Sequence, residues 1–327
     1  MAETKVNTTE KKKKFDVVLF INKYNTILIF VLMIVISSLV SSSFFSAGNL
    51  TNILKQQAGL GVVSLGMLMV IMTGGIDLSV GAILTLGNIV FAYVLAKDMG
   101  LVMAILAAVG VGLLCGIISG FMVSYQKIAA FVVTLAIMQI AKGFAYIISG
   151  GASIQINSPE YLLFSKSYIL GLPTQFYIMI IIFIVIFLVF KFTTYGRLVL
   201  AIGSNEEAVR LSGIRTNIYR MSVYAVSGAF SAISGIIVCG RTGVGSPLVG
   251  DGTEMDAIAA CVIAGANLSG GNGSVVKTLF GVFTLGLISN IMNLLKIPAY
   301  PQLVIKGIII LVAVLLPQFT KRENSNT

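Results

Sequence analysis

Long apolar runs separated by short polar turns make up most of the chain. Runs of roughly 18 to 23 residues recur along nearly its whole length, and each can cross about 30 Å of hydrocarbon as a helix. We therefore predict an all-α integral membrane protein with about ten transmembrane helices and no separate soluble domain. The predicted segments are about 25–44, 52–73, 77–96, 101–124, 129–148, 174–192, 217–239, 255–270, 275–293 and 302–317.

The composition agrees with this pattern. Of 327 residues, 57% are hydrophobic and 10% are charged, and the mean hydropathy is +0.99, which is more apolar surface than one soluble core can bury. The net charge of +10 does not indicate nucleic acid, because the basic residues lie in tails and loops and not on one amphipathic face. We expect them to anchor the protein in the bilayer.

The basic residues also predict the orientation. An even number of segments places both termini on one side, and 15 of the 22 basic residues fall there, which makes that side the cytoplasm. The chain then divides into a basic cytoplasmic tail (1–24), a membrane domain (25–317) and a cytoplasmic C-terminal tail (318–327). The 15 residues are Lys5, Lys11, Lys12, Lys13, Lys14, Lys23, Lys127, Lys191, Arg197, Arg210, Arg215, Arg220, Lys277, Lys321 and Arg322.

Two longer hydrophilic stretches are predicted, one on each side. The external loop at about 149–173 carries turn signals and no helix pattern. In the cytoplasmic loop at about 193–220, Ser204 to Glu207 is typical of a helix start, Ala208 to Leu211 continues the helix, and Gly213 ends it. We expect Glu206 and Glu207 to be exposed and to matter for contact with a partner more than for folding.

A seven-residue echo links two polar interruptions of the apolar pattern. Gly75-Ile-Asp-Leu-Ser-Val-Gly81 resembles Gly265-Ala-Asn-Leu-Ser-Gly-Gly271, and repeats with broken helices are common in transporters. Asp77 has two open interpretations: it lines a translocation route or proton relay, or it caps the third segment by accepting backbone N–H bonds near the headgroups. The candidate pathway residues here are Gly75, Asp77, Ser79, Asn267 and Ser269.

Asn290 and Asn293 are two further pathway candidates, on one face of the ninth segment with Ser289 beside them. Their amides are suited to a sugar, but interhelical hydrogen bonding explains them equally well. For Asp256, near Glu254, we expect the role of a helix N-terminal charge and not of a ligand.

The sequence offers no catalytic or metal site of a familiar kind. It contains no His, Cys115, Cys239 and Cys261 lack metal-ligand spacing, and no Gly-x-x-x-x-Gly-Lys-Ser/Thr motif is present. If ATP drives this chain, a partner must hydrolyse it.

Four collinear stretches resemble the ribose-type permease family of ABC sugar importers. They are Met72 to Gly81, Gly196 to Ile214, Asp256 to Gly273, and Asn290 to Leu295 with Lys306-Gly307. Two departures are Ala129-Ala130, where the family often has a proline, and Asn272, where a basic residue is common.

The resemblance implies partners and a fold. It implies a second permease copy (identical or paralogous), a cytoplasmic sugar-importer ATPase that holds ATP and Mg, and an extracytoplasmic solute-binding protein, in a permease fold like that of vitamin B12 importers with discontinuous helices. The family handles ribose, xylose and galactosides. By resemblance, the segment that docks on the ATPase is Asn205, Glu206, Glu207, Ala208, Arg210, Leu211, Ser212 and Gly213. The alternative is an ion-coupled secondary transporter that needs no ATPase, with Asp77 as its ion site.

Overall fold

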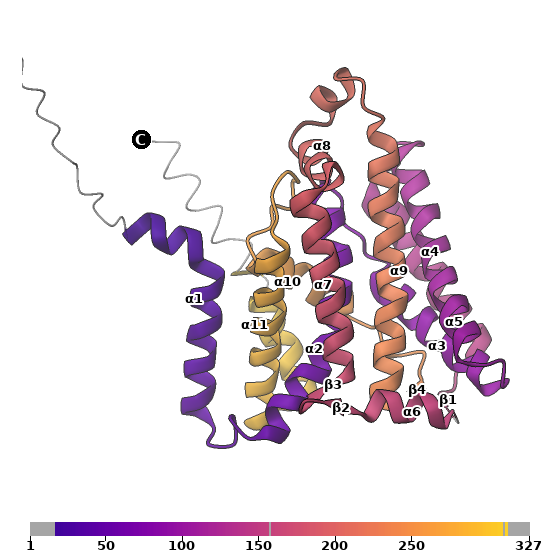
Figure 1. Ribbon diagram of the computed structural model, residues 1–327, viewed down its shortest axis with the longest axis vertical. Coiled ribbons are helices and arrows are strands. Elements are labelled where there is room, and N and C mark those ends of the chain that lie inside the picture. Colours follow the sequence, from indigo (N-terminus) through magenta and orange to yellow (C-terminus); the bar gives the residue numbers. More distant parts are fainter. Residues whose placement is uncertain (1–16, 157, 310, 313–327) are drawn as a thin grey trace, which may run out of the picture.

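The computed structural model describes residues 17–156, 158–309 and 311–312, and these form a bundle of helices whose long axes run roughly alongside one another (Figure 1). Within these residues, helices occupy most of the chain, as predicted. Their bounds are α1 Val17–Val40, α2 Ala47–Met72, α3 Val80–Ala96, α4 Leu101–Ser124, α5 Ala130–Ser149, α6 Pro159–Lys166, α7 Thr174–Phe192, α8 Thr194–Leu211, α9 Thr216–Thr242, α10 Thr253–Ile263 and α11 Val275–Leu294; residues 299–309 and 311–312 are also helical.

Six helices of the described ranges are long and apolar enough to cross a membrane: α2, α4, α5, α7, α9 and α11. The apolar stretches Tyr24–Val40 and Val80–Ala96 are shorter. The predicted segment 255–270 is not a full crossing, because α10 has 11 residues and spans only about 16 Å at 1.5 Å per residue. The predicted segment 302–317 lies partly outside the described residues.

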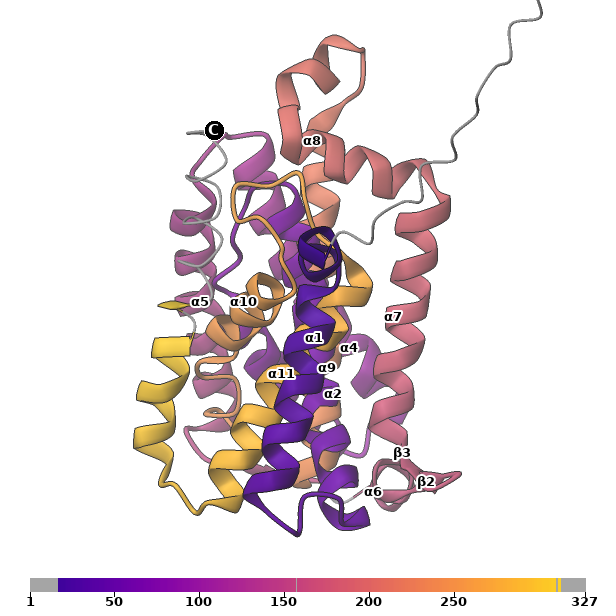
Figure 2. The same cartoon turned by 90° about the vertical axis from the view of Figure 1, so that its left-hand side faces the viewer.

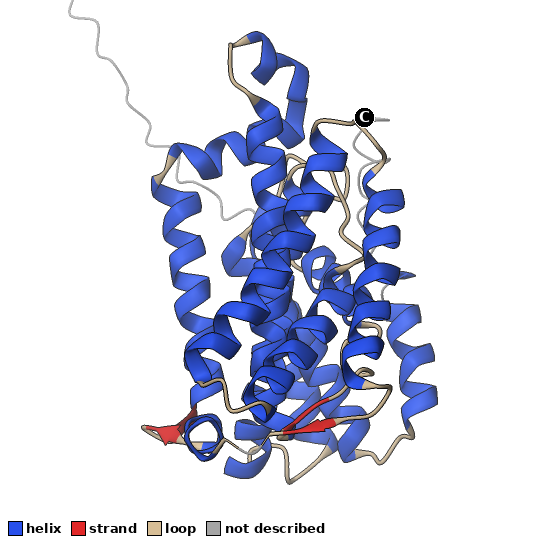
Figure 3. Cartoon of the chain, turned by 90° about the vertical axis from the view of Figure 1, so that its right-hand side faces the viewer, coloured by secondary structure: helices blue, strands red, loops and turns tan. Residues whose placement is uncertain are grey.

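The two ends of the bundle differ, and we name them the α6 end and the α8 end after the helices that lie there (Figure 1). The four strands of the described ranges lie at the α6 end (Figure 3). There β1 (Ile154–Gln155) pairs antiparallel with β4 (Val244–Gly245), and β2 (Tyr168–Ile169) pairs with β3 (Leu172–Pro173). The prediction that residues 149–173 contain no helix was wrong, because α6 lies among them. Ser158 is placed to cap α6 by accepting the N–H of Tyr161 at 3.4 Å, with Pro159 at the first helical position, where a proline is tolerated.

The α8 end also departs from the predicted loop 193–220. Residues 194–204 are helical and precede a kink at Asn205, whose φ of −160° and ψ of 93° are not helical. This helix runs across the end of the bundle, at a steep angle to α7 (Figure 2). A second short helix, 206–211, follows the kink and is the helix that the sequence predicted.

Glycine contacts bring α4 and α9 close together. An added Cβ at Gly112, Gly116 or Gly120 would lie no more than 2.6 Å from a backbone carbonyl of α9, so the two backbones touch with no side chain between them. Gly110, on the same helix, would have no atom within 4 Å of its Cβ. Along α4, therefore, only the glycines that face α9 are needed for packing.

This contrast predicts opposite effects for two identical substitutions. Gly116→Ala forces a methyl group against the carbonyl of Tyr224 and should lower stability by about 1–3 kcal/mol. Gly110→Ala should leave stability unchanged or raise it by up to about 1 kcal/mol through helix propensity. Thermal unfolding of both variants in detergent tests this, and equal melting temperatures would contradict the close α4–α9 contact.

Candidate functional site

The chain leaves helical conformation between α2 and α3, in the interior of the bundle. Gly74 has a φ of +79°, and the N–H groups of Gly74 and Gly75 bond to the carbonyls of Ile71 and Val70 at 2.9 and 3.2 Å. This pattern closes the end of α2. Gly75, Asp77 and Ser79, three predicted pathway residues, all lie in this break.

Asp77 is fully buried and holds the break together. Its Oδ1 accepts the backbone N–H of Ser79 at 3.0 Å and the Ser79 hydroxyl at 2.5 Å, and its Oδ2 accepts the Ser227 hydroxyl of α9 at 3.0 Å. A backbone N–H is accepted, as in the capping interpretation, but inside the bundle instead of near the headgroups. Both carboxylate oxygens thus have protein partners.

A second break follows α10 and repeats this geometry. Gly265 has a φ of +83° and ends α10 as Gly74 ends α2. The structural counterpart of Gly265 is therefore Gly74, whereas the sequence echo paired Gly265 with Gly75. Asn267 Oδ1 accepts the N–H of Ser269 at 3.2 Å, the same two-residue bond that joins Asp77 to Ser79. The sequence echo therefore reflects a common local structure.

The two breaks touch each other and α8. The N–H of Gly271 bonds to the carbonyl of Met72 at 3.0 Å, and a Cβ added at Gly203 would overlap that same oxygen. The first half of α8 therefore rests directly on the end of α2. A movement of α8 toward α2 would therefore also displace the end of α2.

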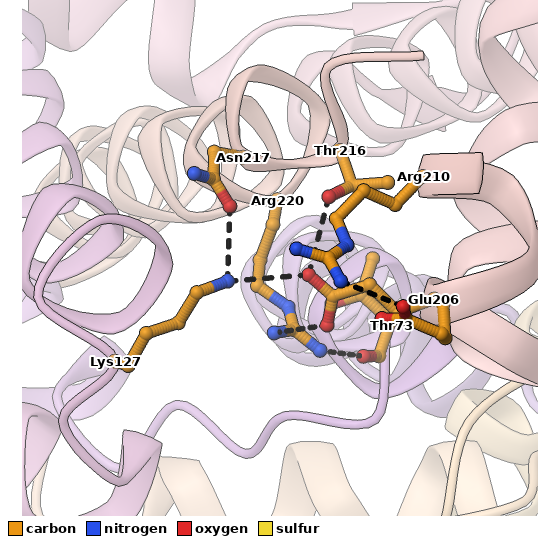
Figure 4. Close-up of polar contacts among 8 residues, drawn as sticks. Thr73, Lys127, Glu206, Arg210, Thr216, Asn217 and Arg220 are labelled. Atoms are coloured by element: carbon orange, nitrogen blue, oxygen red, sulfur yellow. Dashed lines mark hydrogen bonds and ion pairs between the residues drawn. The ribbon is translucent and has the colours of Figure 1, made fainter. Parts of the chain in front are cut away.

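Ion pairs at the α8 end strengthen this contact (Figure 4). Glu206 Oε2 lies 2.8 Å from Arg220 and its Oε1 lies 3.3 Å from Lys127, while the Thr216 hydroxyl donates to Oε1 at 3.2 Å. Arg220 also donates to the carbonyl of Thr73 at 3.2 Å. We call these five residues the α8 junction; they connect the short helix 206–211 to the end of α2, the start of α9 and the turn before α5.

Glu206 and Glu207 are not equivalent, which corrects the expectation that both are exposed. The side chain of Glu206 is 26% exposed. That of Glu207 is 61% exposed and, among the described residues, pairs only with Arg210, at 2.6 Å. Partial burial alone would raise the pKa of Glu206, but the charges of Arg220 and Lys127 outweigh it and hold the pKa below its usual 4.5. The Glu206 pairs therefore stabilise the fold above that pH and are lost as the pH falls through the lowered pKa.

The short helix 206–211 has the predicted start and end. Asn205 Oδ1 accepts the N–H of Ala208 at 3.0 Å, which makes Asn205 the N-cap, and Gly213 follows Ser212 with a φ of +82°. Leu211, at the far end, is 78% exposed. An exposed leucine beside charged side chains on a protruding helix (Figure 2) is typical of a surface that contacts another protein.

A cavity of about 300 Å³ lies among α2, α3, α9, α10, α11 and the helical residues after 298. Nine of its fourteen lining residues are polar or charged. The buried amide oxygen of Gln57 has no hydrogen-bond partner among the described residues, and Arg241 forms no ion pair with any of them. The polar side chains are Gln56, Gln57, Ser234, Arg241, Thr253, Asp256, Ser289, Gln302 and Lys306.

None of the seven predicted pathway residues lines this cavity. Asn290 instead exchanges two hydrogen bonds with Asn49 of α2, at 2.7 and 3.1 Å, which is the interhelical arrangement left open by the sequence. Asn293 accepts a bond from Gln302 at 3.0 Å. Asp256 lies in the first turn of α10, as expected, and also pairs with Lys306 at 2.8 Å.

Gln57 and Arg241 were missed by the sequence analysis. A signal for them exists, because each places a strongly polar side chain within a predicted apolar helix or at its end. Nothing in the sequence, however, brings α2 and α9 to one cavity.

The comparisons with known proteins identify permease components of transport systems. Residues 49–314 match the family model described as branched-chain amino acid transport system / permease component. The ribose import permease protein RbsC of Haemophilus influenzae is 36% identical over 93% of this chain and 96% of its own length, and RbsC of Bacillus subtilis is 37% identical over 97% and 98%. The L-arabinose transport system permease protein AraH of Escherichia coli is 32% identical over 92% of each. No solved structure matches the chain.

The difference between the two glutamates can be measured. Glu206→Gln removes both ion pairs and leaves the partly buried Arg220 without its counter-charge, so stability should fall by about 1–3 kcal/mol and trypsin should cleave faster at Arg215. Glu207→Gln is the matched control and should change neither quantity, because its pair is exposed to solvent. Equal effects of the two substitutions on melting temperature and cleavage rate would show that Glu206 has no special place in the α8 junction.

Proposed function

The chain belongs to the ribose-type permease family of ABC sugar importers, and from this premise we propose that it forms the membrane pathway for a monosaccharide. The observation that carries the proposal is the collinear match to sugar permeases over more than nine-tenths of both chains. The protein is accordingly a multi-pass protein of the bacterial plasma membrane and not an enzyme. Hydrolysis of ATP, with its Mg, belongs to a separate ATPase, and an extracytoplasmic binding protein delivers the solute.

The cavity supports a sugar over the branched-chain amino acids named in the family description. A branched aliphatic side chain needs an apolar pocket, whereas nine of the fourteen residues here offer amide, hydroxyl or charged groups. Such groups exchange hydrogen bonds readily with the hydroxyls of a sugar. We propose an aldopentose, such as the ribose and arabinose of the relatives' names, as the first solute to test.

The geometry of Asp77 argues against the ion-coupled alternative. A proton or sodium site needs a carboxylate that is open to the pathway, but both oxygens of Asp77 are occupied by Ser79 and Ser227. We propose that Gly75, Asp77, Ser79, Asn267 and Ser269 act by shaping the two breaks, without touching the solute. Asn290 and Asn293 likewise hold helices together.

We further propose that the α8 end faces the cytoplasm, with both termini on that side and the chain crossing about ten times if the half-helix α10 is counted. The helix breaks support a fold like that of vitamin B12 importers, in which two copies of the chain would form the pathway. The segment from Asn205 to Gly213 would dock on the ATPase, with Glu207, Arg210 and Leu211 as its exposed contacts.

The orientation has a direct test. In a variant without native cysteines, Ser204→Cys should react with a membrane-impermeant maleimide only after the cells are opened, because it lies at the α8 end. Ser153→Cys, at the other end, should react in intact cells. The reverse pattern would overturn the orientation.

Docking through the short helix can be tested with two leucines of similar exposure. Leu211→Asp places a charge in the proposed contact and should abolish co-purification with the ATPase, while the permease still inserts in the membrane. Leu163→Asp is the matched control, since Leu163 of α6 is 74% exposed at the opposite end, and it should co-purify normally. Retention of the ATPase by Leu211→Asp would exclude this helix as the docking segment.

The function itself is tested by reconstitution of the permease with its ATPase and binding protein in vesicles. ATP-dependent uptake of labelled ribose or arabinose, absent without the binding protein, is the expected result. A complete complex that takes up leucine and no sugar would refute the proposed solute class.

A further inference from the structure

The Gln57 side chain is an unusual buried group. It is 6% exposed, and its amide oxygen has no hydrogen-bond partner among the described residues, although an orphaned amide costs free energy in a low-dielectric interior. The side chain packs against the backbone of α11, where an added Cβ on Gly286 would lie 2.5 Å from the Gln57 amide carbon. Gln57 thus lines the cavity and carries a buried amide oxygen that no described residue satisfies.

Arg241 presents donors to the same cavity from the last turn of α9. It has no carboxylate partner in the described residues, in contrast to Lys306, which is neutralised by Asp256 at 2.8 Å. The wall of the cavity therefore holds a guanidinium without a counter-charge among the described residues and an amide whose buried oxygen is unsatisfied there. The Asp256–Lys306 pair, which joins α10 to the helical residues after 298, completes the wall.

We propose that this cavity is a solute-binding compartment in the translocation pathway, in which Gln57 and Arg241 bind hydroxyl groups of a neutral monosaccharide. A sugar hydroxyl both donates and accepts, so one ligand can satisfy the Gln57 oxygen and the Arg241 N–H groups together. An anion would pair with Arg241 but would leave the Gln57 oxygen without a donor. This inference rests on the proposed function and adds to it the residues that touch the sugar.

The position of the cavity fits a transient binding site. Eight of its fourteen lining residues lie in the first turns of α2 and in the second halves of α9 and α11. The α8 junction instead holds the opposite ends of α2 and α9, at Thr73 and Thr216. Substitutions in the cavity should therefore change solute passage without changing how the ATPase is held.

Substitution and uptake test the proposal in the reconstituted complex. Gln57→Leu and Arg241→Gln should each reduce ATP-dependent uptake of labelled ribose or arabinose by about tenfold or more, which is the effect of losing roughly 1.4 kcal/mol or more of binding, while binding-protein-stimulated ATP hydrolysis persists. The matched controls are Gln175→Leu, which removes another buried glutamine with an unpaired amide oxygen outside the cavity, and Arg197→Gln in α8. Both controls should keep uptake within about twofold of wild type.

Occupancy gives a second readout that does not depend on a variant's turnover. In a variant without native cysteines, Ser289→Cys, inside the cavity, should be alkylated more slowly when the transported sugar is present, and Gln57→Leu should abolish that protection. Gln57→Asn, which keeps the amide, should restore part of both uptake and protection. If Gln57→Leu acted only by misfolding the protein, restoring the amide would not recover either quantity.

The outcomes separate this proposal from the proposed function. If Gln57→Leu and Arg241→Gln leave wild-type sugar uptake unchanged, and sugar does not protect the thiol of the Ser289→Cys variant, the compartment is overturned and the importer stays intact. Transport of another solute class, and of no sugar, by the wild type would instead refute the proposed function as a sugar importer, whatever the variants do.

Discussion

Inside a bilayer every backbone N–H and C=O must find its partner within the protein, and the interior of this molecule is arranged around that constraint. The chain leaves helical conformation at the ends of α2 and α10, where a glycine with positive φ closes each helix. The groups that are freed are taken up locally: Asp77 and Asn267 each accept a backbone N–H two residues ahead, and the carbonyl of Met72 accepts the N–H of Gly271. The broken helices are stable here because the backbone groups at the breaks find hydrogen-bond partners within the protein.

The same constraint explains where charge is tolerated. Asp77 is buried among donors, Asp256 is paired with Lys306, and Glu206 lies between Arg220 and Lys127. Each of these three carboxylates has partners that offset its desolvation. Arg241, by contrast, lines the polar cavity and has no ion-pair partner among the described residues.

Much of the architecture could be predicted from the sequence because it depends on local signals. Hydrophobic runs indicated the helices, paired glycines before Asp77 located the first break, and Asn205 with Gly213 bounded the short helix. Two local signals were misread: Ser158-Pro159 starts α6, and residues 194–204 form a helix that runs along the end of the bundle. The cavity could not be predicted, because Gln57, Arg241, Asp256 and Lys306 meet only through packing of distant segments. The distinction between Glu206 and Glu207 also needed the fold, since it depends on which glutamate faces Arg220.

The glycine contacts between α4 and α9 have a mechanical consequence. Two helices whose backbones interlock at Gly112, Gly116 and Gly120 cannot slide past each other without steric overlap, so they must move as one solid body. Such a body can tilt or rotate as a whole but cannot deform internally. Relative motion during a transport cycle is then confined to surfaces where side chains, and not backbones, meet. The cavity that separates α9 from α10 is lined by side chains of both helices, so relative motion there would change the cavity while the α4–α9 pair kept its shape.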